Sequence, residues 1–171
     1  MIIINTGNGK GKTTSAIGQI VRYLGQGFKI CLIYLFKSEH CCGENNILSK
    51  LNNIDILYFV NQHPYFNTNI HTSDIILECN LALSKLKEFV NSNHRYDVFV
   101  LDEFNIALKD KFINEKNFIS VVQLLSKQSD IIITGRGATQ KLLDLADLVT
   151  DMIDVKHPYS HGILAKKGLE F

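Results

Sequence analysis

The chain has 171 residues, of which 46% are hydrophobic and 20% are charged; this balance excludes a disordered protein and allows one domain with a buried core. The formal net charge of +1 offers no strongly basic surface for nucleic acid or an anionic membrane. No apolar run has membrane-spanning length and no signal-like segment opens the chain, so we expect a cytoplasmic protein without a membrane or nucleic-acid partner.

Apolar runs alternate with stretches of helical periodicity along the whole chain. The expected strands are residues 2–4, 29–36, 54–60, 97–101, 131–133 and 148–155. The expected helices are residues 15–24, 47–51, 72–90, 104–108, 118–125 and 139–146. This alternation predicts an α/β fold, with a mostly parallel sheet and helices on both faces, in a single domain over residues 1–171.

The turn after the first apolar run has the composition of a phosphate-binding loop. It reads Thr6-Gly7-Asn8-Gly9-Lys10-Gly11-Lys12-Thr13-Thr14, between a strand and a helix, which is the context that such a loop requires. Glycines let backbone N–H groups converge on an anion, and the helix start adds its positive dipole end. Lys12 can then reach phosphate oxygens and the Thr13 hydroxyl can ligate Mg²⁺. We expect the Lys12 side chain to be largely exposed in the site.

The spacing of this loop departs from the common pattern G-x-x-x-x-G-K-[ST]. Counting back from Gly11 puts Thr6 where the first glycine should stand, and Gly7 comes one residue too late. The altered length indicates a nucleotide that does not sit as in an ordinary ATPase. The alternative interpretation is a glycine-rich turn with incidental lysines.

Two further strand ends carry candidate site residues. The run 98–101 ends in Asp102-Glu103, where an acid of a phosphate-loop protein holds Mg²⁺ directly or through water; the alternative is a helix cap by Asp102. The turn after the run 131–133 contains Arg136, whose guanidinium can bind phosphate oxygens as a fork; the alternative is an exposed arginine in a turn.

These segments, together with the tail, resemble the ATP:corrinoid adenosyltransferases of the phosphate-loop type, which complete adenosylcobalamin. The matching segments run in order along the chain: residues 7–14, 101–105, 134–138, 155–159 and 167–171. The resemblance implies a RecA-like P-loop domain, a homodimer, and MgATP bound in an orientation reversed from ordinary phosphate-loop enzymes. A reversed nucleotide would account for the short loop.

The resemblance also implies roles for particular residues. The residues implied to bind the ATP phosphates are Gly7, Asn8, Gly9, Lys10, Gly11, Lys12, Thr13, Thr14 and Arg136. Lys12 and Arg136 are the implied catalytic residues, and Thr13, Glu103 and Asp102 the implied ligands of Mg²⁺ or Mn²⁺. Lys37 and Gly43-Glu44 fall near the family's Lys-Gly…Gly-Glu loop, although Ser38 stands where glycine is usual.

Three departures from the family pattern concern the corrinoid more than ATP. The family usually has a segment before the first strand, whereas this sequence starts at the strand. His63-Pro64-Tyr65-Phe66 lies about where a Gly-Phe-Thr-Trp stretch is common, and Ile106 replaces a tyrosine. Tyr65 and Phe66 are candidate corrinoid contacts; the alternative is that they pack onto the domain.

The implied reaction transfers the 5′-deoxyadenosyl group of MgATP to the Co(I) of cob(I)alamin or a corrinoid precursor and releases inorganic triphosphate. Co(I) is a nucleophile without a proton to remove, so the protein needs no general base. It must position C5′ and stabilise the leaving charge, while a reductase partner supplies electrons. Two rivals remain: a RecA-like ATPase or small-molecule kinase with Glu103 as base, and a non-catalytic nucleotide or corrinoid binder.

Overall fold

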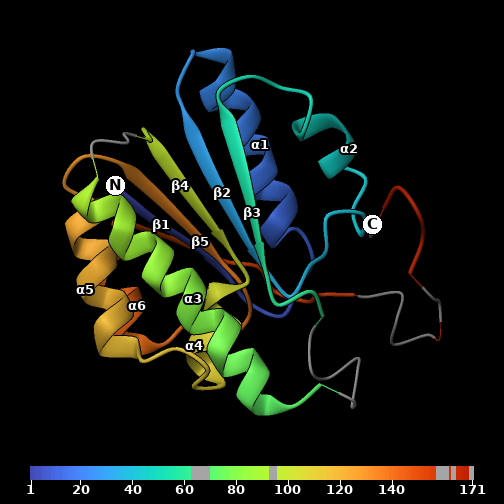
Figure 1. Ribbon diagram of the computed structural model, residues 1–171. Coiled ribbons are helices and arrows are strands. Elements are labelled where there is room, and N and C mark those ends of the chain that lie inside the picture. Colours follow the sequence, from blue (N-terminus) through green and yellow to red (C-terminus); the bar gives the residue numbers. More distant parts are fainter. Residues whose placement is uncertain (63–69, 93–95, 157–161, 163–164, 170–171) are drawn as a thin grey trace.

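The computed structural model describes residues 1–62, 70–92, 96–156, 162 and 165–169. Within them, six parallel strands form one sheet in the order β3-β2-β4-β5-β1-β6 (Figure 1). The strands are β1 (Ile2–Thr6), β2 (Ile30–Leu35), β3 (Ile54–Phe59), β4 (Val98–Asp102), β5 (Asp130–Thr134) and β6 (Leu148–Asp151). The helices are α1 (Lys12–Gly25), α2 (Asn45–Leu48), α3 (Thr72–Asn91), α4 (Phe104–Lys109), α5 (Glu115–Leu125) and α6 (Gln140–Leu145).

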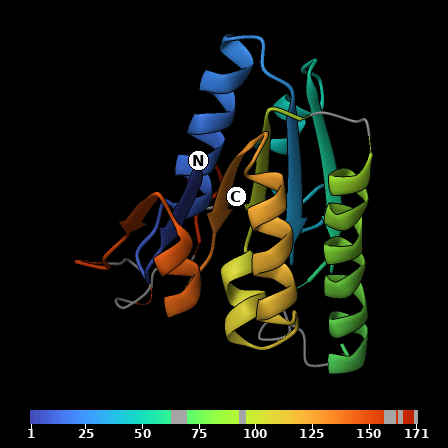
Figure 2. The same cartoon turned by 90° about the vertical axis from the view of Figure 1, so that its left-hand side faces the viewer.

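The sheet is covered on both faces, as Figure 2 shows with α1 on one side and α3 and α5 on the other. Successive side chains of a strand point to opposite faces, so Ile33 and Leu101 join the core under α3 and α5. Leu32 and Val100 join the core under α1. The four inner strands are buried almost throughout, which explains their continuous apolar runs. The predicted α/β fold is therefore confirmed.

The last strand is shorter than the sequence predicted. We expected a strand over residues 148–155, but β6 ends at Asp151, which pairs with Thr6 at the end of β1. Beyond Thr6 the neighbouring chain becomes the glycine-rich loop, so Met152 has no strand beside it. The Met152 carbonyl instead accepts a hydrogen bond from the Gly9 backbone N–H at 2.6 Å.

The strand order decides which loops meet. Strands β2, β4, β5 and β1 are successive neighbours, and the carboxyl ends of parallel strands share one edge of the sheet. The loop after β1, Lys37 after β2, Asp102 and Glu103 at the end of β4, and Arg136 after β5 therefore lie at that edge. Within the described part of the chain, no helix combines the length and apolar composition needed to cross a bilayer.

Candidate functional site

A cavity of about 570 Å³ opens at the carboxyl edge of the sheet. Its lining includes most of the predicted nucleotide and metal residues: Gly9, Lys10, Gly11, Lys12, Thr13, Thr14, Glu103 and Arg136. Most of the remaining wall is formed by Lys37, Cys42-Gly43-Glu44 and the tail residues Gly168-Leu169. Gly7, Asn8 and Asp102 are not part of the lining, and Tyr65 and Phe66 lie outside the described residues.

The loop after β1 needs glycine at several positions for two different reasons. Gly7 and Gly11 have φ angles of 97° and 110°, in the left-handed region that favours glycine. At Gly9 the reason is space: a Cβ would lie 2.6 Å from the carbonyl oxygens of both Met152 and Ile153. The chain after β6 is thus packed directly against the loop.

The expectation that the Lys12 side chain is exposed is wrong. Only 8% of Lys12 is exposed, because its ammonium donates hydrogen bonds to the carbonyl oxygens of Gly7 at 2.8 Å and Gly9 at 2.6 Å. Burial, and then the positive charge of Arg136, lower the pKa of Lys12. The loop therefore wraps around its own lysine, and the Lys12 ammonium donates hydrogen bonds that hold the loop at the cavity wall.

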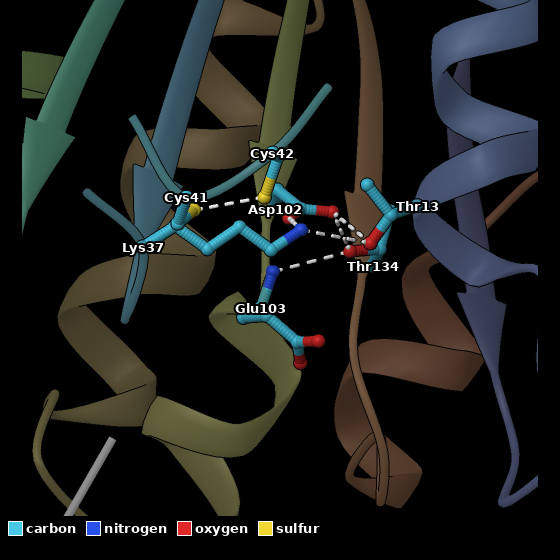
Figure 3. A network of polar contacts seen from close by, with 7 residues as sticks. All are labelled: Thr13, Lys37, Cys41, Cys42, Asp102, Glu103 and Thr134. Atoms are coloured by element: carbon cyan, nitrogen blue, oxygen red, sulfur yellow. Dashed lines mark hydrogen bonds and ion pairs between the residues drawn. The ribbon is translucent and has the colours of Figure 1, made fainter. Parts of the chain in front are cut away.

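Asp102 is the centre of a polar network that includes the cavity residues Thr13 and Lys37 (Figure 3). The residue is 1% exposed, and its Oδ1 accepts hydrogen bonds from the hydroxyls of Thr13 at 3.0 Å and Thr134 at 2.6 Å. Its Oδ2 accepts from the Lys37 ammonium at 2.7 Å. The helix-cap alternative for Asp102 is wrong, since Glu103 takes the cap position of α4 and makes no side-chain cap bond.

Lys37 was missed as a partner of Asp102. Burial alone would lower its pKa, but the Asp102 carboxylate outweighs burial and raises the pKa of Lys37, so the ammonium stays charged. The position of Lys37 in the sequence could have indicated this contact. Lys37 follows the expected second strand closely, and therefore lies at the same edge of the sheet as Asp102.

Glu103 presents one carboxylate oxygen without a hydrogen-bond partner among the described residues. Its backbone has a φ of 66°, an uncommon conformation for a residue with a side chain, and its N–H donates to the Thr134 hydroxyl at 3.1 Å. The Oε2 atom is buried and has no hydrogen-bond partner among the described residues. Burial, followed by repulsion from Asp102, raises the pKa of Glu103 to about 7.

These oxygen donors fit a hard divalent cation. Mg²⁺ is usually held by one or two carboxylates together with waters and substrate phosphates, and a buried carboxylate oxygen without a partner is suited to that role. Glu103 supplies this oxygen and Thr13 a hydroxyl at the start of α1. Among the described residues, no group of three His, Cys, Asp or Glu side chains could hold a metal ion.

Arg136 follows β5 in a turn held by Asn105. The Asn105 side-chain amide donates to the Gly135 carbonyl at 3.0 Å, and Gly135 has a φ of 126°. Arg136 and Lys12 face the same cavity, and their mutual repulsion contributes to the lowered pKa of Lys12. Two cations beside a glycine-rich loop at the start of a helix are suited to bind a polyanion.

Replacing Glu103 with glutamine should stabilise the metal-free protein at alkaline pH. A carboxyl whose pKa rises from 4.5 to about 7 on folding contributes stability below its unfolded pKa and loses it as the pH rises through its folded pKa. At about pH 8 the variant should exceed wild type by on the order of 1–3 kcal/mol in free energy of unfolding. Urea denaturation across the pH range measures this; a difference that persists unchanged at acidic pH would contradict it.

The sequence of this chain is similar to one known protein family along its whole length. The model of the family described as ATP:corrinoid adenosyltransferase BtuR/CobO/CobP matches residues 1–171. A corrinoid adenosyltransferase of Sinorhizobium sp is 32% identical over 176 residues, covering 100% of this chain and 80% of that protein. One of Pseudomonas aeruginosa is 30% identical over 171 residues, covering 100% and 83%.

A likeness to a solved structure concerns the fold alone. The flagellar accessory protein FlaH from Methanocaldococcus jannaschii matches with a TM-score of 0.52 at 14% identity, over 88% of this chain and 69% of that chain. The architecture shared by the two chains is the RecA-like P-loop fold.

Proposed function

Because this chain belongs to the ATP:corrinoid adenosyltransferase family, we propose that it transfers the 5′-deoxyadenosyl group of ATP to the Co(I) of a corrinoid and releases inorganic triphosphate. The family match makes it a nucleotide-binding transferase that adenosylates corrinoids with ATP. The observation that carries the finer proposal is the convergence of Lys12 and Arg136, with the glycine-rich loop, on one cavity.

In the proposed reaction Co(I) attacks C5′, and the bond between C5′ and its oxygen breaks. Cobalt supplies the electron pair of the new Co–C bond, and the triphosphate leaves with the pair of the broken bond. No proton moves, so Glu103 is not needed as a base. Lys12, Arg136 and the loop N–H groups would stabilise charge on the leaving group, where loss of a single donor typically costs about 10²–10³ in rate.

A bound Mg²⁺ or Mn²⁺ would supply further neutralisation of the leaving triphosphate. We propose Thr13 and Glu103 as its ligands, with Asp102 behind Thr13 rather than in direct contact. Asp102 already accepts from Thr13, Thr134 and Lys37, which leaves Glu103 as the carboxylate with an unpartnered oxygen. We also propose a cytoplasmic homodimer that receives electrons from a reductase.

Alanine at both Tyr65 and Phe66 should slow transfer when the reaction starts from Co(II) and a mild reductant, and much less when Co(I) is supplied. We propose that these aromatics pack against the corrinoid and favour cobalt without its lower axial ligand, which is easier to reduce. The rate of Co–C bond formation in the two assays measures this. Equal losses in both would assign the two residues to the fold or to general binding.

The leaving group tests the proposed function. Phosphorus NMR of a reaction with MgATP and chemically reduced Co(I) corrinoid should show inorganic triphosphate, formed in step with a light-sensitive Co–C product. ADP and phosphate should stay near background with or without corrinoid. A mixture dominated by ADP, without a Co–C bond, would overturn the proposal and favour an ATPase or kinase. Binding of both ligands without turnover would favour a non-catalytic protein.

A further inference from the structure

The ammonium of Lys37 lies where three groups of the site meet. It donates to Asp102 Oδ2 at 2.7 Å and to Thr13 Oγ1 at 3.2 Å, and it lies 5.1 Å from the centroid of the Tyr34 ring. The Asp102 side chain is 1% exposed and the Lys37 side chain 19%. Figure 3 shows the lysine reaching across from the end of β2 to both residues. A lysine this well surrounded is held in place rather than lying free in the cavity.

The hydroxyl that Lys37 contacts is the one proposed to bind the metal. A threonine hydroxyl has one proton to donate and two lone pairs to accept with. Thr13 Oγ1 gives its proton to Asp102 Oδ1 at 3.0 Å and accepts from Lys37. A divalent cation on this oxygen would therefore lie beside an ammonium that already occupies one lone pair. It would also meet a carboxylate, Asp102, that Lys37 has already neutralised.

We propose that Lys37 is a built-in counter-ion that keeps divalent metal away from Thr13 and Asp102 until a polyphosphate arrives. The charge balance explains the dependence on polyphosphate. Without it, a metal ion on Thr13 would lie beside the Lys37 ammonium, and the Asp102 carboxylate that could attract the ion is already paired with that ammonium. A polyphosphate reverses that balance, so metal and polyphosphate bind as one unit. This inference rests on the metal site of the proposed function and on nothing about the corrinoid.

Removal of the Lys37 charge should create a metal site that works without nucleotide. In Lys37→Met the buried Asp102 carboxylate loses its counter-ion, while Thr13 regains a lone pair. Mn²⁺ alone should then bind at least about tenfold more tightly than to wild type, because opposite charges attract strongly at a partly buried site. By thermodynamic reciprocity, the gain in Mn²⁺ affinity that inorganic triphosphate produces should shrink in this variant.

Calorimetric titration of Mn²⁺ alone, and of a preformed Mn²⁺–triphosphate complex, into each protein tests the proposal. Lys10→Met is the matched control: it removes an ammonium from the same cavity, but one that contacts the Leu169 carbonyl, and its affinity for Mn²⁺ alone should match wild type. Lys37→Arg keeps the charge and should also match. The double variant Lys37→Met/Asp102→Asn should lose the gained affinity.

Equal tightening in Lys10→Met and Lys37→Met would overturn the proposal, since cavity charge rather than the Lys37 contact would then be responsible. If circular dichroism shows that Lys37→Met does not fold, the wild-type protein alone tests the proposal. The proposal is overturned if wild type binds Mn²⁺ alone as tightly as it binds the Mn²⁺–triphosphate complex. It is supported if wild type binds Mn²⁺ alone much more weakly than that complex. The titrations contain neither ATP nor corrinoid. Failure of wild type to bind the triphosphate complex at all would count instead against the proposed function.

Discussion

Replacement of Lys12 with alanine should abolish adenosyl transfer and weaken the fold of the phosphate loop as well. The ammonium donates to the carbonyls of Gly7 and Gly9, so the variant leaves two loop acceptors without their donor. We expect a loss of about 1–3 kcal/mol in free energy of unfolding. The leaving triphosphate also loses a charge-assisted partner, which should lower the transfer rate at least about 10²-fold.

Two measurements separate these effects: the rate of Co–C bond formation, and denaturant unfolding without ligands. Lys10→Ala is the control for stability. Lys10 belongs to the same loop but is exposed, so its removal should change the free energy of unfolding by less than about 0.5 kcal/mol. Near-normal turnover in a folded Lys12→Ala protein would count against this phosphate site.

The fold was predictable because its signals are local. Runs such as Ile2–Ile4 and residues 131–133 are apolar at every position, which is typical of strands buried on both faces, and the helices between them have clear periodicity. The end of β6 was not predictable in this way. Residues 152–155 look like a continuation of the strand, but the strand ends where its neighbour ends, at Thr6. That boundary depends on pairing between segments far apart in the chain.

The residues that line the cavity could be predicted from their positions after strands, but their contacts could not. Residues 7–14 follow β1 and Asp102-Glu103 lie at the end of β4, and the sheet brings most of them to one cavity. What the sequence could not show is which oxygen each cation binds. Lys12 binds carbonyls of its own loop rather than lying exposed, and Lys37 binds a carboxylate 65 residues away. Both contacts depend on backbone geometry that the residue types do not encode.

Alanine at Gly9 should disrupt the site without removing any functional group. Its methyl carbon would lie 2.6 Å from the carbonyl oxygens of Met152 and Ile153, and these are backbone atoms that cannot rotate away. Either the loop or the chain after β6 must move, which breaks the hydrogen bond from Gly9 N–H to Met152. We expect a loss of about 1–3 kcal/mol in stability, together with weaker binding of metal–triphosphate because the loop carbonyls that hold Lys12 shift.

Gly18→Ala is the matched control for that prediction. Gly18 is exposed within α1, and a Cβ there would meet nothing within 4 Å. Because glycine in a helix interior is less favourable than alanine, this variant should gain about 0.5–1 kcal/mol in free energy of unfolding and bind metal–triphosphate as wild type does. Denaturation and calorimetry of the two variants measure the contrast. If Gly9→Ala kept wild-type stability and binding, the close packing of the phosphate loop against the chain after β6 would be wrong.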